Sequence, residues 1–547
     1  MPAATARHTA GRTGTGPLTG TGTLVRLMLR RDRLKLPAWV GGMGLFVVYV
    51  GVALPGVAPT EEALASVVPV FNQPVGRMFT GPGLGLDAPT YERFFAAGYV
   101  LYLFVIAALM NIMLLARHTR AEEQSGRAEL VRANVAGRHA ALTAALVVAL
   151  VADVAVTLVV AGLASANGFA ATGSLIVGVA CGLVGLAFAG ITAVTVQLSE
   201  YSRSAAGLAG GALGVAFVLR ALGDMAQVGG SALSWASPLG WGSQAAPYVL
   251  DRWWPLLLHV ALVVVTVTLA FWLQSRRDLG AGLVAARPGR PVARPSLGTP
   301  LGLAARLQRP SALAWGLAVV ALGVVDGLFA QALVDSASEL PPAIQEMFGT
   351  RGMTDGYLAF LAVLTGYVTS AYVVFAVQSL RVEEARGRAE AVLATPTSRA
   401  AWAGSHLVVV AAWAAAIMVA TGLLTGLAAA GVTGDGSLLG RTLLAHVNLV
   451  PAVLVVLGLC ALLYGWAPVL LAPVAWTLVG VMVLVGNFGT LLDLPRWLMD
   501  VSPLSHPAQV PVEELTVAPL VVLLVLAAVG VALGLLGLGR RQVHGRS

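Results

Sequence analysis

Residues 120–140 read RAEEQSGRAELVRANVAGRHA, and residues 381–401 read RVEEARGRAEAVLATPTSRAA. Eleven of the 21 aligned positions are identical, and charged residues are among them, so alanine richness does not explain the match. A period of 261 residues in a chain of 547 indicates two related halves. We call residues 120–129 the first charged segment and residues 381–390 the second charged segment. Their shared polar and glycine positions are Arg120 and Arg381, Glu122 and Glu383, Glu123 and Glu384, Gly126 and Gly387, Arg127 and Arg388, and Glu129 and Glu390.

The sequence on both sides of these segments is strongly apolar. Hydrophobic residues make up 57% of the chain and charged residues only 11%, against about 25% charged residues in soluble domains. Runs of about 20 apolar residues recur, and each is long enough to cross the bilayer core as a helix. We therefore predict an all-α polytopic membrane protein with twelve transmembrane helices. The predicted spans are 37–55, 93–116, 141–163, 174–198, 204–222, 254–274, 312–333, 357–379, 402–430, 441–463, 467–487 and 518–538.

The basic residues predict the orientation. With both termini in the cytoplasm, the cytoplasmic loops hold 27 of the 34 Lys and Arg residues, and the outer loops hold seven. This bias follows the positive-inside rule and places the chain in the cytoplasmic membrane, the inner membrane where a cell has two. It also accounts for the net charge of +8, so we expect contact with membrane lipid and no binding of nucleic acid.

Both charged segments follow the second predicted span of their half and precede the third. A weaker match, Ser-Pro-Leu at 237–239 and 502–504, precedes each sixth span. Because six is an even number, the halves are expected to be parallel repeats. Basic amphipathic stretches, residues 24–36 and LGLAARLQRP at 301–310, predict an interfacial helix before each half. The predicted domains are a disordered cytoplasmic tail at 1–23, a first half at 24–274, a Pro- and Arg-rich cytoplasmic linker at 275–297, a second half at 298–538 and a tail at 539–547.

The charged segments allow two interpretations. Each could be a solvated loop with helix-stabilising ion pairs. Alternatively, each could be a short surface helix on which another protein docks. Retention of one charge pattern in both halves favours docking, since two identical partner subunits would require two similar surfaces.

At these residues the chain resembles the type 2 ABC transporter permeases, which carry an acidic, Gly-containing coupling helix between the second and third spans. The second half, EEARGRAEAVLATPTSR, is close to that pattern, whereas Ala and Gly replace the Pro-Thr-Ser portion in the first half. The fused length and the Arg-rich composition are similar to actinobacterial permeases of polyketide-antibiotic exporters. The resemblance implies that two copies of a cytoplasmic ABC ATPase subunit, carrying ATP and Mg, drive outward transport of a hydrophobic, drug-like small molecule. It makes the charged segments the coupling helices.

The chain itself is not expected to be an enzyme or to hold a cofactor or metal. A P-loop requires a lysine, and the single lysine, Lys35, lies outside any such pattern. The two cysteines lie inside apolar runs, away from any metal-ligand cluster. The alternative function is a proton-coupled drug transporter of the major facilitator type, since twelve spans and buried acids also fit that architecture. Against it, the facilitator signature is missing from the loop between the second and third spans.

Polar residues inside the predicted spans are candidates for a substrate pathway. A carboxylate in the bilayer costs about 3 kcal/mol, so Asp153 and Asp326 need an explanation, either a substrate or proton role or a structural pair with an arginine. His259, His446 and Asn448 are better explained as hydrogen-bonding groups between helices. The outer segment 56–92 is expected to contain a short amphipathic helix that could act as a lid over the outer mouth.

Overall fold

The computed structural model describes residues 16–129, 136–278, 280–284, 291–331, 353–488 and 495–541. Most of both predicted tails, part of the linker and the 130–135 portion of the first repeat lie outside these residues. The chain divides into two compact units, Met1–Pro288 and Gly289–Ser547, which we describe separately.

Helices account for both units, and no strand occurs among the described residues, which confirms the all-α fold class. Among the described residues, eleven helices are long and apolar enough to cross a membrane, and Leu471–Gly486 is a shorter apolar helix where the eleventh span was predicted. The long helices of unit 1 are α2 (Lys35–Val57), α6 (Val100–His118), α9 (Ala140–Ala166), α10 (Ala171–Leu198), α11 (Ser202–Ala226) and α14 (Trp254–Ser275). Those of unit 2 are α15 (Pro300–Leu328), α18 (Met353–Ala385), α20 (Arg399–Thr433), α21 (Ser437–Asn448) with α22 (Val450–Trp466), α23 (Leu471–Phe488) and α25 (Val517–Arg540).

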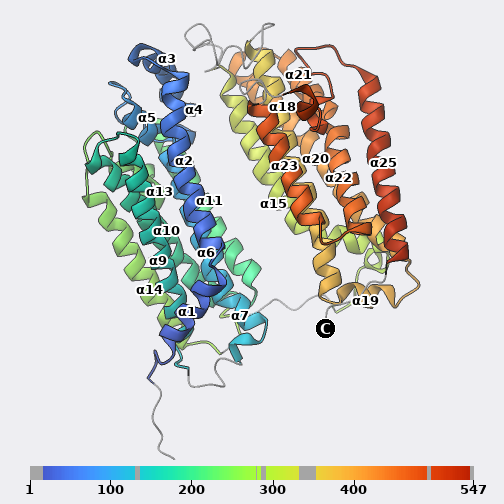
Figure 1. The fold of residues 1–547 in the computed structure, drawn as a ribbon, viewed down its shortest axis with the longest axis horizontal. Coiled ribbons are helices and arrows are strands. Elements are labelled where there is room, and N and C mark those ends of the chain that lie inside the picture. Colours follow the sequence, from blue (N-terminus) through green and yellow to red (C-terminus); the bar gives the residue numbers. More distant parts are fainter. Residues whose placement is uncertain are drawn as a thin grey trace, which may run out of the picture. The chain divides into compact units, whose positions relative to one another are not determined.

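Unit 1 is built around α10, which packs against α6, α9, α11 and α14 (Figure 1). Small residues let these helices approach closely. A Cβ added at Gly178 would meet the Thr157 carbonyl oxygen at 2.5 Å, and one at Gly190 would meet the Thr266 hydroxyl at 2.1 Å. Close approach of this kind is how apolar helices associate where lipid surrounds them.

Unit 2 has two tight helix pairs, α22 with α25 and α15 with α20 (Figure 1). A Cβ at Gly465 would meet the Gly534 carbonyl oxygen at 2.1 Å, and one at Gly327 would meet the Thr425 carbonyl oxygen at 2.4 Å. Glycine at these positions therefore fixes which helices become neighbours.

The predicted interfacial helices differ between the units. In unit 1 a separate helix, α1 (Thr21–Arg31), ends at Asp32 before α2 begins. Residues 16–23, expected to belong to a disordered tail, are held against unit 1, because the Thr19 and Pro17 carbonyls accept hydrogen bonds from the Gly137 and His139 amides. In unit 2 the corresponding stretch is continuous with the following span in α15, which carries Pro310 inside it.

Two further boundaries differ from the prediction. The predicted span 93–116 is interrupted at Tyr99, between α5 (Tyr91–Gly98) and α6. The outer segment 56–92 forms two short helices, α3 (Glu61–Asn72) and α4 (Pro74–Thr80), at the end of unit 1 opposite α1 and α7 (Arg120–Gln124) (Figure 1).

A buried arginine network fastens this outer segment to α11. The Arg77 guanidinium donates to the Asp224 and Met225 carbonyl oxygens at 2.8 and 2.9 Å. Arg220 pairs with the Asp224 carboxylate at 3.2 Å and donates to carbonyl oxygens of α4. Burial lowers the pKa of Arg77, and the nearby Asp224 carboxylate opposes this shift. The helix α4 is therefore anchored to the unit and does not lie loosely over it.

Candidate functional site

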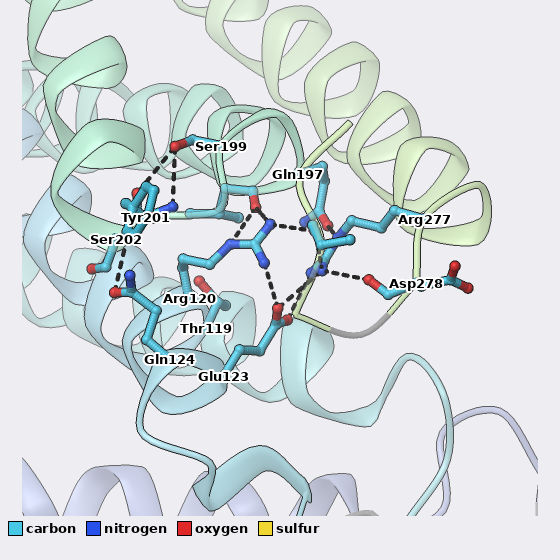
Figure 2. A network of polar contacts seen from close by, with 12 residues as sticks. Thr119, Arg120, Glu123, Gln124, Gln197, Ser199, Tyr201, Ser202, Arg277 and Asp278 are labelled. Atoms are coloured by element: carbon cyan, nitrogen blue, oxygen red, sulfur yellow. Dashed lines mark hydrogen bonds and ion pairs between the residues drawn. The ribbon is translucent and has the colours of Figure 1, made fainter. Parts of the chain in front are cut away.

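On the side that faces the helices of unit 1, which we call the inner side, two arginines bind Glu123 of the first charged segment (Figure 2). The Glu123 carboxylate accepts hydrogen bonds from Arg120 Nη1 at 2.7 Å and from Arg277 Nη1 and Nη2 at 2.9 and 2.7 Å. Arg120 is 1% exposed and also donates to the Val196 carbonyl oxygen at 3.1 and 2.7 Å. These contacts join the segment to the ends of α10 and α14.

The chain after α14 closes the same network. Arg277 Nε donates to Gln197 Oε1 at 2.6 Å, and the Ala281 carbonyl oxygen accepts from Arg120 at 3.1 Å (Figure 2). The amides of Leu283 and Val284 donate to carbonyl oxygens at the end of α10, both at 3.0 Å. The start of the predicted linker is therefore ordered against unit 1.

The second charged segment has the same inner arrangement with different supporting residues. Arg381 Nη1 donates to the Pro468 carbonyl oxygen, just after α22, at 2.6 Å. The buried Glu384 carboxylate accepts from Arg541 Nη2 at 2.8 Å and from the Tyr464 hydroxyl at 3.0 Å. In both units the first arginine thus binds the chain near the end of a neighbouring helix, and the second glutamate pairs with an arginine.

The sequence analysis missed these pairing arginines. Arg277 lies two residues after the end of α14, and Arg541 lies directly after α25. Each is the second residue of an Arg-Arg pair, SRRD at 275–278 and GRRQ at 539–542. That dipeptide, which follows the last apolar run of each half, is the signal that could have identified them.

The outer sides of the two segments also match. Arg127 pairs with Glu122 at 2.8 Å and Arg388 pairs with Glu383 at 2.6 Å, in both cases across five residues of sequence. The hydrogen bond to Glu122 raises the pKa of Arg127, which stays protonated. Both arginines are about half exposed, at 53% and 52% of the side chain.

A glycine in the left-handed region makes the turn in each segment. Gly126 has φ 73° and Gly387 has φ 69°, values that favour glycine over residues with a Cβ. In unit 2, the short helix α19 (Arg388–Leu393) begins directly after this turn. Glu129 and Glu390 follow three residues after the glycine and are both exposed.

A hollow open to solvent adjoins the second segment. It has a volume of about 400 Å³ and lies between the end of α19 and the start of α20. Its lining comes from the repeated stretch itself, namely Glu390, Leu393, Ala394, Thr397, Ser398 and Arg399. The second repeat therefore presents a concave surface beside an exposed pattern of charges.

In unit 1, the helix α1 is tied to the charged segment. Arg31 pairs with Glu122 at 2.9 Å, and the buried Asp32 pairs with Arg117 and with His118 Nε2, the latter at 2.6 Å. No residue in the corresponding part of α15 makes such an ion pair among the described residues. The charge pattern is shared by the units, whereas this additional tie is not.

Asp153, a candidate for the substrate pathway, pairs with an amide and not with an arginine. Its Oδ1 accepts from Asn111 Nδ2 at 2.9 Å, in the buried space between α6, α9 and α10. A Cβ at Gly185 would meet Asp153 Oδ1 at 2.3 Å, so glycine makes room for the pair. Asn111 is a polar residue inside an apolar run, and this could have identified it as a candidate partner of Asp153.

Asp326 lies at a helix end. It occupies the last turn of α15, where its backbone carbonyl oxygen accepts from the Tyr357 hydroxyl at 2.8 Å. The predicted span 312–333 had placed this carboxylate near the middle of the bilayer. The candidates Asp153 and Asp326 belong to different units.

The remaining three candidates are hydrogen-bonded within their own units. His259 Nε2 donates to the Pro238 carbonyl oxygen of the repeated Ser-Pro-Leu motif at 2.8 Å. His446 Nδ1 donates to the Thr442 carbonyl oxygen at 2.8 Å, and Asn448 Nδ2 donates to the Ala508 carbonyl oxygen at 2.7 Å. These contacts favour packing as the role of all three residues.

The sequences of both units match a known protein family. A family model described as the multidrug efflux system permease Rv1217c, C-terminal domain, matches residues 22–273 and 297–538. The chain is 36% identical over 546 residues to the multidrug efflux system permease protein Rv1217c of Mycobacterium tuberculosis (strain ATCC 25618 / H37Rv), covering 98% of each chain. The chain belongs to this efflux permease family.

Membership in the family, together with the eleven long apolar helices found in the part of the chain that the structure describes, makes this chain a multi-pass membrane permease homologue. The two matched segments leave out residues 274–296, from the last two residues of α14 to the start of the short 3-10 helix Pro295–Gly298. The facilitator alternative gains no support from this membership.

Proposed function

We propose that this chain is the membrane subunit of an ABC exporter that moves hydrophobic, drug-like molecules out of the cell. It would span the cytoplasmic membrane twelve times as two parallel six-helix halves, with both termini in the cytoplasm. Two copies of a separate ABC ATPase subunit, which carry ATP and Mg, would supply the energy. The relative named as a multidrug efflux permease supports the drug-like cargo.

One observation carries the proposal: two distant stretches of sequence share three local features in two separate units, although Arg120–Gln124 is a short helix of its own and residues 381–385 are the end of the long helix α18. Each has a left-handed glycine, an exposed Arg-Glu pair across the turn and a shielded glutamate bonded by an arginine after the last helix. A solvated loop needs no such match. Two identical partners that each dock on one segment would need it, and would also need the segment to be fixed firmly to the helices behind it.

The proposal assigns contact with the ATPase to exposed residues of each segment and assigns attachment of the segment to buried ones. Arg127 and Arg388 are exposed and point to docking, whereas Glu123 and Glu384 are engaged inside their units. A docking test should therefore change the exposed arginines, because reversal of the inner glutamates would disturb the fold.

The experiment is affinity purification of the tagged chain from its native membrane, as wild type and as the R127E/R388E double variant. The proposal predicts that an ABC ATPase subunit accompanies the wild type and is lost from the double variant. Arg203→Glu, at an exposed arginine at the same end of unit 1 but outside the segments, should retain the subunit. Purification of the wild type without any ATPase subunit, together with proton-driven transport, would overturn the proposal.

A further inference from the structure

The arginines at the ends of α14 and α25 form matching links to the charged segments. Arg277 bonds Glu123 at 2.9 and 2.7 Å, and Arg541 bonds Glu384 at 2.8 Å. The two partners are 154 residues apart in unit 1 and 157 residues apart in unit 2. In each unit, the last helix is thus joined to the segment by an ion pair at its end.

Both links are shielded from water. The side chains of Glu123 and Arg277 are 11% and 6% exposed, and those of Glu384 and Arg541 are 7% and 23% exposed. Ion pairs in water separate easily, whereas removal of one partner from a shielded pair leaves an uncompensated charge. A shielded pair therefore resists separation of the elements that it joins.

Both links are Glu-Arg ion pairs, but different residues support them in the two units. Gln197 and Arg120 support the pair in unit 1, and Tyr464 supports the pair in unit 2. The preceding arginine of each dipeptide lies over a tryptophan ring, Arg276 over Trp272 at 3.9 Å and Arg540 over Trp466 at 5.9 Å. If only helix packing were needed, nothing would require the same Glu-Arg pair in both units.

We infer that Arg277 and Arg541 are positioning residues that transmit movement of the charged segments to α14 and α25. This inference rests on the proposed function, because it assumes that an ATPase subunit moves the segments. When a segment shifts, its shielded glutamate pulls the arginine, and the end of the last helix moves with it. Among the described residues, the exposed pairs, Arg127 with Glu122 and Arg388 with Glu383, make no hydrogen bond or ion pair with α14 or α25 that could perform this task.

Hydrogen exchange measured by mass spectrometry tests the link without knowledge of the cargo. The full complex with its ATPase subunit is compared in the absence of nucleotide and with ATP and vanadate. In the wild type, nucleotide should change exchange both at 381–390 and at the end of α25. In the Arg541→Gln variant the change at 381–390 should persist, whereas the change at the end of α25 should fall about fivefold or more.

Two further variants separate transmission from simple stabilisation. Arg540→Gln, a control at the neighbouring arginine, should behave as the wild type. The swap E384R/R541E should restore the response at α25, since it rebuilds the pair with reversed charges. Arg277→Gln should give the same local loss at the end of α14.

The outcomes are distinct for the two proposals. If no ATPase subunit accompanies the wild type, the proposed function fails and the link fails with it. If the subunit is present but Arg541→Gln leaves the response at α25 unchanged, or the swap fails to restore it, the link is refuted and the proposed function stands. An equal loss at both places would also refute transmission, because it would show general destabilisation of unit 2.

Discussion

Replacement of Glu123 by Gln should destabilise the protein far more than replacement of its neighbour Glu122. Glu123 accepts three hydrogen bonds from Arg120 and Arg277, whose side chains are 0% and 6% exposed. Glu122 pairs with Arg31 and Arg127, whose side chains are 39% and 53% exposed. The two variants should differ because the arginines that bind Glu123 are buried. When the Glu123 carboxylate is removed, these arginines cannot be hydrated instead, whereas Arg31 and Arg127 can.

The magnitudes follow from this burial. Removal of one partner from a buried ion pair costs about 3–5 kcal/mol, and the substituted amide would retain one accepting oxygen, so we expect about 3 kcal/mol for Glu123→Gln. Two exposed pairs contribute about 0.5 kcal/mol each, or about 1 kcal/mol together. The difference of about 2 kcal/mol corresponds to roughly a 30-fold change in the unfolding equilibrium.

The assay is unfolding of the purified chain in mixed micelles with increasing SDS, followed by circular dichroism. Glu384→Gln and Glu383→Gln give the same comparison in unit 2, with a smaller difference because a single arginine contacts Glu384. Equal free energies of unfolding for Glu123→Gln and Glu122→Gln would refute the reasoning, since the two carboxylates would then be held equally firmly.

Three further predictions concern other parts of the chain. Asp153→Asn should leave dye efflux unchanged and should leave the melting temperature unchanged or raise it. The variant keeps the pair with Asn111 and removes a carboxylate that costs about 3 kcal/mol in the bilayer. Loss of efflux in a folded variant would instead assign Asp153 to the transport pathway. Arg77→Ala should speed hydrogen exchange in 74–80 and leave the opposite end of unit 1 unaffected, and unchanged exchange would show that α4 is held by other contacts. Gly126→Ala and Gly387→Ala should each lower the free energy of unfolding by about 1 kcal/mol in the SDS titration, because both glycines have a positive φ. The added Cβ would meet no close neighbour, so the loss would come from the backbone conformation alone. A stabilising effect would contradict the left-handed turn.

Much of the fold could be predicted from the sequence because lipid imposes a simple rule. A chain segment that crosses the bilayer must satisfy its own backbone hydrogen bonds, so apolar runs of about 20 residues become helices. The charged segments could be located from a different signal, the recurrence of the same charges in both halves. The Arg-Glu pair on the outer side of each segment was not predicted, because it spans five residues across a glycine turn, whereas ion pairs within a helix lie three or four residues apart.

Contacts between distant parts of the chain could not be predicted in this way. The pairing of Glu123 with Arg277 depends on where α14 ends relative to α6, and that position is set by packing around α10. Asp153 was expected to pair with an arginine if structural, and its partner is Asn111, because an amide can be buried at lower cost than a second charge. The separation of α1 from α2 likewise depends on Asp32, whose partners lie in a different helix.

The number of ATPase subunits bound to one copy of this chain can be measured from the mass of the intact complex. The tagged chain, extracted from its native membrane in a mild detergent, would be weighed by native mass spectrometry. We predict one copy of this chain with two copies of an ABC ATPase subunit, because each unit presents one docking segment. A chain that is found without an ATPase subunit, or with only one copy that survives loss of either Arg127 or Arg388, would contradict it.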